Sequence, residues 1–414
     1  MCRVPYLSDN SKSYINLTQH ALQIDWGFIM DKRFNGYLSV PSARIDFPED
    51  DRKEISRKID EVLKSGMLTL GKYTKEFEEN FREYVKTEHA VAVNSGTAAL
   101  EICLRASGIK NSSVVVPTNT FCATPAAVIH AGCKVIFSDI GDDMCLDPDS
   151  LQNSIKKDTK AAIIVHIAGN ITENINAIKD ICNDKNILLI EDAAHAAGSS
   201  FAGVKAGNIG GCAAFSFYPT KVMTSGEGGM ITANSKEICK KALVLRDQGK
   251  ESFNSNNIVE LGYNWRMSEI SAIIGMQQLK RLDEFIEKRK KAAGIYNKVL
   301  KETENIRPLV VPKKASPNCY KYVASLDCLA EGKIKREGLK KNMKEKFGVS
   351  LSGEVYDVPC HLQPVFKNFF GNIGLPNSER LCRSHICLPI YPQMKKEEAE
   401  YAADCLTKAV GDLR

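Results

Sequence analysis

The chain has 414 residues, of which 43% are hydrophobic and 26% are charged, and this composition excludes a disordered or fibrous protein. The formal net charge is only +6, and the basic runs lack the interleaved aromatic residues of a nucleic-acid surface, so we expect no nucleic-acid partner. No run approaches the roughly 18 apolar residues of a membrane helix, and no signal-peptide core opens the chain, which predicts a cytoplasmic protein without membrane contact.

The 14 cysteines are scattered singly along the chain and never form a CxxC pair. Zinc modules and dithiol redox centres place their cysteines at close, regular spacing. We therefore predict no metal site and interpret the cysteines as buried, reduced thiols.

Three regions follow one another along the chain. Residues 1–50 show no repeat and are predicted to be an N-terminal extension. Between residues 51 and 290, short apolar runs such as HAVAVN and SVVVPTN alternate with amphipathic stretches such as GTAALEICLRAS, which predicts an α/β domain with a largely parallel sheet between helices. A long charged helix, roughly from Ser268 to Leu300, then leads into residues 291–414, which we expect to form a smaller α+β domain.

The first polar turn of the large domain lies in HAVAVNSGTAALEICL. A predicted strand ends there at Asn94, and a helix begins near Thr97. Backbone N–H groups at such a helix start bind anions, so Ser95, Gly96 and Thr97 are candidates for a phosphate site. An equally good interpretation is that Ser95 or Thr97 only caps its own helix.

Two further strands also end in candidate site residues. Phe121 follows the strand VVV in a polar loop, where its ring either packs in the core or offers a flat surface to a flat ligand. The apolar strand NILLI ends in Glu191 and Asp192, with His195 three residues later. A carboxylate at this position needs a cation or hydrogen-bond donors, and it either caps the next helix or holds a protonated ring nitrogen.

The stretch SFYPTKVMTSGEGGM places Ser216 and Lys221 beside a cluster of glycines. Withdrawal of a lysine from water lowers its pKa and favours the neutral amine that forms an imine with an aldehyde. The four segments together suit a ligand with a phosphate, a flat ring, a ring nitrogen and a carbonyl, which are the groups of pyridoxal 5'-phosphate (PLP). The motifs GxGxxG, GxxxxGK[ST], HExxH and GxSxG are absent.

In these segments the chain resembles the DegT/DnrJ/EryC1/StrS family of PLP-dependent sugar aminotransferases, which have the aspartate-aminotransferase fold type I. The resemblance extends from GMLTLGKYTKEFEENF through NSGTAAL, TFCAT, EDAAHAAGS, SFYPTK and GYNWRMSE to HLQPVF and LPIYPQM. It implies a mostly parallel seven-stranded sheet sandwiched by helices, and a homodimer with shared active sites.

The resemblance also implies roles for individual residues. Lys221 would be the Schiff-base lysine, Asp192 the partner of the pyridinium nitrogen, and Phe121 the ring stacked on the cofactor. Ser95, Gly96, Thr97 and Ser216 would bind the phosphate, and His195 would lie near the phenolic side of the ring. Asn264, in GYNWRMSE, would reach the phosphate of the neighbouring subunit.

By this resemblance, the expected reaction is a ping-pong transfer of an amino group from L-glutamate, or glutamine, to a keto sugar. We expect a nucleotide-linked 3- or 4-keto deoxyhexose, with a free keto sugar phosphate or a keto polyol as the alternative acceptor. A sugar dehydratase that uses pyridoxamine phosphate is a rival, but the dehydratases that resemble this chain have histidine in place of Lys221. A sensor without turnover is another rival, although it would not need a nucleophilic amine. Tyr320 to Tyr322 and His361 to Gln363 either face the acceptor or pack in the small domain.

Overall fold

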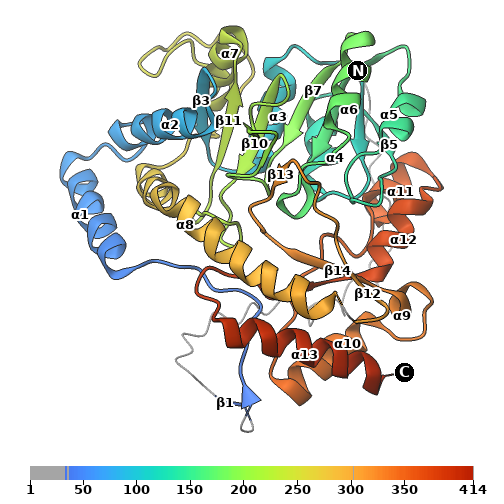
Figure 1. Cartoon of the computed structure of the whole chain (residues 1–414). Helices are drawn as coiled ribbons and strands as arrows, with labels where there is room; N and C mark the ends of the chain where they lie inside the picture. Colours follow the sequence, from blue (N-terminus) through green and yellow to red (C-terminus); the bar gives the residue numbers. More distant parts are fainter. Residues whose placement is uncertain (1–32, 35–36, 302, 414) are drawn as a thin grey trace, which may run out of the picture.

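A computed structural model describes residues 33–34, 37–301 and 303–413 of the protein (Figure 1). Its central sheet has seven strands in the order β3-β11-β10-β7-β6-β4-β5. β11 runs antiparallel to both of its neighbours, and every other pair in this sheet is parallel. The mostly parallel α/β sheet of seven strands is therefore confirmed. The strands are β3 (His89–Val93), β4 (Ser113–Pro117), β5 (Lys134–Ser138), β6 (Thr159–Val165), β7 (Leu188–Asp192), β10 (Cys212–Ser216) and β11 (Gly229–Ala233).

Helices cover both faces of this sheet, as Figure 1 shows. Alternate residues of a strand point to opposite faces. In β4, Val114 and Val116 belong to one hydrophobic core and Val115 belongs to the other. A strand that is apolar on both faces is typical of a parallel sheet buried on both sides. The first core includes side chains of α3 (Gly96–Ala106), α4 (Ala123–His130) and α7 (Lys236–Arg246), and the second those of α2 (Lys72–Val85), α6 (Ile175–Asp184) and α8 (Glu269–Leu300).

The C-terminal part is built on an antiparallel sheet in the order β12-β14-β15. Its core also contains Tyr296 and Leu300 of α8, so this one helix passes through residues 290–291, where we place the domain boundary. The division into residues 1–50, 51–290 and 291–414 stays a prediction. The elements of this part are β12 (Ile306–Pro308), β14 (Tyr322–Leu326), α9 (Asp327–Ala330), α10 (Arg336–Phe347), η2 (Cys360–Leu362), α11 (Pro364–Phe370), α12 (Pro376–Ser384), β15 (His385–Leu388) and α13 (Lys396–Asp412).

The predicted N-terminal extension falls largely outside the described residues. Within them, Val40 is fully buried against the small domain, where its backbone N–H donates to the carbonyl of Gly348 (3.0 Å). None of the described helices is long and apolar enough to cross a lipid bilayer. The remaining elements are β1 (Arg33–Phe34), β2 (Tyr37–Leu38), α1 (Glu49–Ser65), α5 (Pro148–Ser154), η1 (Ile167–Gly169), β8 (Ser200–Phe201), β9 (Val204–Lys205) and β13 (Ala315–Ser316).

Candidate active site

Three strands of the central sheet meet at the edge where the polar turns lie. The strand register aligns Val93 of β3 with Gly229 of β11, and Gly229 with Ser216 of β10. A Cβ atom on Gly96 would lie only 2.8 Å from the Cβ of Ser216. Glycine therefore lets the first turn of α3 approach the end of β10, and the two segments form one continuous surface.

The N-terminus of α3 points its unpaired backbone groups at this surface. Ser95 is the N-cap residue, and its Oγ accepts a hydrogen bond from the backbone N–H of Ala98 (3.1 Å). The capping interpretation is thus confirmed for Ser95, while Thr97 is exposed in the first turn. The first N–H groups of a helix have no acceptor inside the helix and lie at the positive end of its dipole. The turn can therefore cap the helix and still hold a phosphate.

Asp192 ends β7, and its Cα pairs with that of Ala214 in β10. Oδ2 accepts a hydrogen bond from Oγ1 of Thr124 (2.7 Å), and Oδ1 accepts one from the backbone N–H of Ala194 (3.2 Å). Burial raises the pKa of this carboxyl, and the Thr124 hydrogen bond and the charge of Lys221 offset only part of that effect. A buried carboxyl in this state would gain from a protonated ring nitrogen as its partner.

Lys221 lies in the loop after β10, where its Nζ is 5.0 Å from the ring centroid of Tyr320. The centroid of the Tyr320 ring is in turn 4.5 Å from that of His195. Burial lowers the pKa of His195 well below its ordinary value, and the charges of Lys221 and Lys321 lower it further. Burial alone would raise the pKa of Tyr320, but the charges of the same two lysines, the hydrogen bond with Thr220 and the charge of Arg289 together outweigh it, and the pKa is lowered. His195 is therefore a neutral imidazole in a cationic environment.

The side chain of Phe121 is 56% exposed at the edge of the sheet. Its ring stacks on that of Tyr356, with a centroid distance of 5.9 Å and an angle of 29° between the planes. The hydroxyl of Tyr356 lies 3.3 Å from Nε2 of His195. The interpretation of Phe121 as core packing is therefore wrong, and its exposed ring can offer a flat surface to a ligand.

Asn264 lies beside the same turn with its side chain exposed. Its backbone carbonyl accepts a hydrogen bond from Nδ2 of Asn94 (3.3 Å). Leu261 and Tyr263 nearby are 85% and 51% exposed. Large exposed apolar side chains beside polar ones are typical of a surface that binds another protein. The contact of Asn264 with the phosphate of a neighbouring subunit stays a prediction.

The residues considered for the sugar acceptor separate into two groups. Tyr320 lies beside Lys221 and His195, as described above. Tyr322 belongs instead to the small-domain core, where its hydroxyl donates to Oδ1 of Asn297 (2.7 Å). His361 is buried, with Nδ1 2.8 Å from Oγ1 of Thr118. For Tyr322 and His361 the packing interpretation fits the contacts.

Two residues of this site, Thr124 and Tyr356, were not predicted from the sequence. Thr124 is in the TFCAT segment, three residues after Phe121, so the motif held a signal for it. Tyr356 lies in GEVYDVP, where no neighbouring residue marks it. Only the packing of the C-terminal part against the large domain brings it to His195.

The assembled edge fits the chemical groups of PLP. It has an anion-binding helix start next to Ser216, an exposed aromatic ring, a buried carboxyl with a raised pKa and a lysine amine. Nδ1 of His195 is buried and has no hydrogen-bond partner in the described part of the chain, so a ligand group can satisfy it.

Comparison with known proteins matches residues 49–407 to the DegT/DnrJ/EryC1/StrS aminotransferase family. A UDP-4-amino-4,6-dideoxy-N-acetyl-beta-L-altrosamine transaminase of Campylobacter jejuni is 32% identical, over 83% of this chain and 92% of its own. A GDP-perosamine synthase of Vibrio cholerae is 30% identical, over 89% and 98% of the two chains. The solved structure of NtdA from Bacillus subtilis with its cofactor PMP superposes with a TM-score of 0.80 at 26% identity, and the match covers 88% of this chain and 83% of NtdA.

Proposed function

This chain belongs to the DegT/DnrJ/EryC1/StrS aminotransferase family of PLP-dependent enzymes, and we propose that it moves the amino group of L-glutamate, or of glutamine, to a keto sugar. The observation that carries this proposal is that Asp192 and Lys221 lie at the same edge of the sheet. Asp192 is a buried carboxyl with a raised pKa, and the charge of Lys221 acts on it. A binding protein without turnover would need neither group in this arrangement.

The phosphate end of the cofactor would be held by the start of α3. Backbone N–H groups of Gly96 and Thr97 would donate to the phosphate oxygens, together with the hydroxyl of Ser216. Ser95 keeps the helix start in place through its bond to Ala98. These contacts bind and orient the cofactor but take no part in proton transfer.

The cofactor ring would lie against the exposed face of Phe121. PLP supplies a conjugated, protonated ring that accepts the electron pair released when the amino donor loses its Cα proton. The carboxylate of Asp192 would keep the proton on the ring nitrogen, because a positively charged partner offsets the desolvation of the buried carboxylate. His195, neutral and buried, would donate or accept a hydrogen bond on the phenolic side of the ring.

Lys221 would move the protons of the reaction. Its Nζ is the nucleophile that would hold the cofactor through the aldehyde group, and the same amine is the base of the site. This amine would accept the proton that leaves the Cα of glutamate and would then give it up again as a general acid. Over the whole reaction the amino group of glutamate and the keto oxygen of the sugar would change places, which yields 2-oxoglutarate and the amino sugar.

The acceptor is proposed to be a nucleotide-linked 3- or 4-keto deoxyhexose. The support is that two relatives are named after a UDP-linked amino sugar and after GDP-perosamine, and that each match spans most of both chains. A free keto sugar phosphate or a keto polyol is the alternative that an acceptor screen would reveal.

The test compares Lys221→Ala with Lys321→Ala. Both lysines lie near the Tyr320 ring, with Nζ at 5.0 Å and 5.4 Å from its centroid, but only Lys221 is proposed to bind the cofactor. With ¹⁵N-glutamate and a panel of keto sugars, mass spectrometry should find ¹⁵N in the sugar product for the wild type and for Lys321→Ala, and none for Lys221→Ala. Borohydride reduction should attach PLP to the Lys221 peptide. Normal transfer by Lys221→Ala would contradict the proposal.

A further inference from the structure

Tyr356 is a residue of the C-terminal part that reaches the candidate site of the large domain. We propose that Tyr356 is a positioning residue for His195, and that His385 in turn positions Tyr356 through the backbone of Val355. This inference rests on the proposed function, because the ligand that His195 would meet is the cofactor. It concerns a chain of contacts that begins outside the site.

The first contact joins Tyr356 to the site. Its hydroxyl lies 3.3 Å from Nε2 of His195, and its ring lies 6.1 Å from the His195 ring and 5.9 Å from the Phe121 ring. Burial raises the pKa of Tyr356 well above its ordinary value, so the phenol keeps its proton. Tyr356 is therefore a neutral hydrogen-bonding group beside a neutral imidazole.

The direction of this hydrogen bond decides the tautomer of His195. A neutral imidazole has one N–H and one acceptor nitrogen, and a phenol is a better donor than acceptor. If Tyr356 donates to Nε2, the ring proton of His195 is on Nδ1. Nδ1 is buried and has no partner in the described part of the chain, so its N–H remains for an acceptor on the cofactor.

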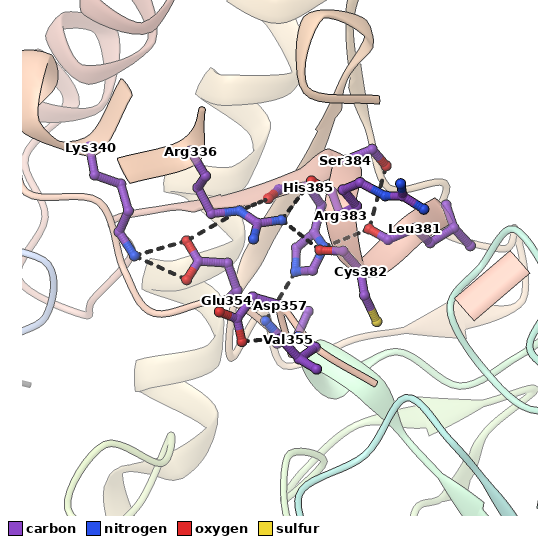
Figure 2. A network of polar contacts seen from close by, with 11 residues as sticks. Arg336, Lys340, Glu354, Val355, Asp357, Leu381, Cys382, Arg383, Ser384 and His385 are labelled. Atoms are coloured by element: carbon purple, nitrogen blue, oxygen red, sulfur yellow. Dashed lines mark hydrogen bonds and ion pairs between the residues drawn. The ribbon is translucent and has the colours of Figure 1, made fainter. Parts of the chain in front are cut away.

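The second contact fixes the backbone just before Tyr356 (Figure 2). Nδ1 of His385 is 2.8 Å from the carbonyl of Leu381, so this nitrogen carries the proton and donates. Nε2 of His385 accepts a hydrogen bond from the backbone N–H of Val355 (3.1 Å). Both ring nitrogens are thus satisfied by backbone groups, and His385 is a neutral link between the end of α12 and Val355.

Charged residues brace the same segment from the other side. Lys340 of α10 donates to both carboxylate oxygens of Glu354, at 2.9 Å and 3.0 Å. Arg336 of the same helix donates to the carbonyls of His385 (2.9 Å) and Arg383 (2.8 Å). Figure 2 shows these side chains around residues 354–355. The segment before Tyr356 is therefore held at two points, which are the side chain of Glu354 and the backbone N–H of Val355.

Three variants test this series of contacts from His385 through Tyr356 to His195. Tyr356→Phe keeps the ring stacked on Phe121 and removes only the hydroxyl. His385→Gln can place an acceptor where Nε2 lies and loses the donor to Leu381. His385→Asn can keep a donor near Nδ1 and loses the acceptor for Val355. The two His385 variants each lose one buried hydrogen bond, so a thermal melt checks that both fold and that their stabilities are similar.

The decisive measurement is the tautomer of His195, read from ¹⁵N-histidine NMR of the full chain with and without PLP. Its signal is assigned by its loss in His195→Gln. We expect the wild type to have its ring proton on Nδ1, and Tyr356→Phe and His385→Asn to lose this preference. His385→Gln should retain it. Turnover should follow the same pattern. We expect kcat to fall about tenfold in Tyr356→Phe and His385→Asn, with the KM for the donor nearly unchanged.

Two outcomes would overturn the proposal. One is an unchanged His195 signal in Tyr356→Phe, a variant that does not depend on the His385 network for folding. The other is an equal effect of His385→Gln and His385→Asn, which would mean that His385 serves stability alone. Failure of the proposed function would look different, because the cofactor-free chain reports the Tyr356 contact even if Lys221 takes part in no transamination.

Discussion

Nε2 of His166 lies 2.9 Å from Oε2 of Glu191, and neither side chain is exposed to solvent. The carboxylate of Glu191 also accepts hydrogen bonds from the backbone N–H groups of Gly207, Ile209 and Gly210, each at 2.8 Å. Burial raises the pKa of Glu191, but His166 and these donors outweigh it and the pKa is lowered. Asp192, the next residue of the strand, faces the other side and has a raised pKa. Of these two adjacent carboxyls, Glu191 therefore stabilises the fold and Asp192 belongs to the candidate site.

For Glu191 we predict a loss of stability. The carboxylate of Glu191 accepts four hydrogen bonds. In Glu191→Gln the NH₂ group of the amide would face some of these donors and could not accept from them, and His166 would lose its anionic partner. The free energy of unfolding should fall by about 3 kcal/mol, the usual cost of breaking a buried pair. Urea denaturation measures this change. Glu79→Gln, which breaks an exposed pair with Arg82, is the control and should cost less than about 1 kcal/mol. Equal losses in the two variants would contradict the assignment.

For Asp192 we predict opposite effects on stability and activity. The ionised carboxyl is buried without a cationic hydrogen-bond partner in the cofactor-free chain, so Asp192→Asn should leave its melting temperature unchanged or raise it. Transamination should fall by at least about a hundredfold, because an amide cannot keep the ring nitrogen protonated. Differential scanning calorimetry and the ¹⁵N transfer assay give the two values. A clear drop in the melting temperature would show that Asp192 is structural.

His385 predicts a pH dependence of stability. Burial lowers its pKa from 6.5 to about 4, with a further small contribution from Arg336, while Leu381, Glu354 and Asp357 act in the opposite direction. The unfolded chain therefore takes up this proton more readily than the folded chain. The stability that His385 contributes is present above pH 6.5 and is lost as the pH falls toward 4.

Between pH 7.5 and pH 5 the loss should be about 2 kcal/mol, since each unit of pKa difference corresponds to about 1.4 kcal/mol. Urea denaturation at the two pH values measures it in the wild type and in His385→Gln, which cannot titrate. Other groups titrate in both proteins, so only the difference between the two proteins reports His385. If that difference is independent of pH, His385 is not the titrating group.

The proposed role of Asn264 at the phosphate of the neighbouring subunit predicts that each active site needs residues from two chains. Lys221→Ala and Asn264→Ala should each be inactive or weak alone. If Asn264 acts across the interface, a mixed dimer has one site with both residues intact. Random mixing should then restore about a quarter of the wild-type activity, because half of the dimers are mixed and each has one good site out of two. Unfolding and refolding the mixed chains and measuring ¹⁵N transfer tests this. No gain over the single variants would place Asn264 in its own site or outside both.

The local parts of the site could be predicted from the sequence because each lies where a strand ends. Asp192 and Ser216 are the last residues of β7 and β10, and Ser95 caps the helix that follows β3. Parallel strands bring their carboxyl ends to one edge of a sheet, so residues in these positions meet without further information. For Phe121 the local pattern favours core packing over a surface for a ligand, and only the 56% exposure of its side chain shows that the ring lies outside the core.

The sequence by itself determined the alternation of strands and helices, the polar turns at the strand ends, and the lysine, carboxyl and phosphate-binding segments that follow from them. These features depend on neighbours within a few residues. The tertiary structure decided that Thr124 bonds to Asp192, that Tyr320 and not Tyr322 joins the site, and that Tyr356 reaches His195. Those contacts join segments far apart in the chain, and the packing of the C-terminal part against the sheet, which no local pattern encodes, brings the two tyrosines into place.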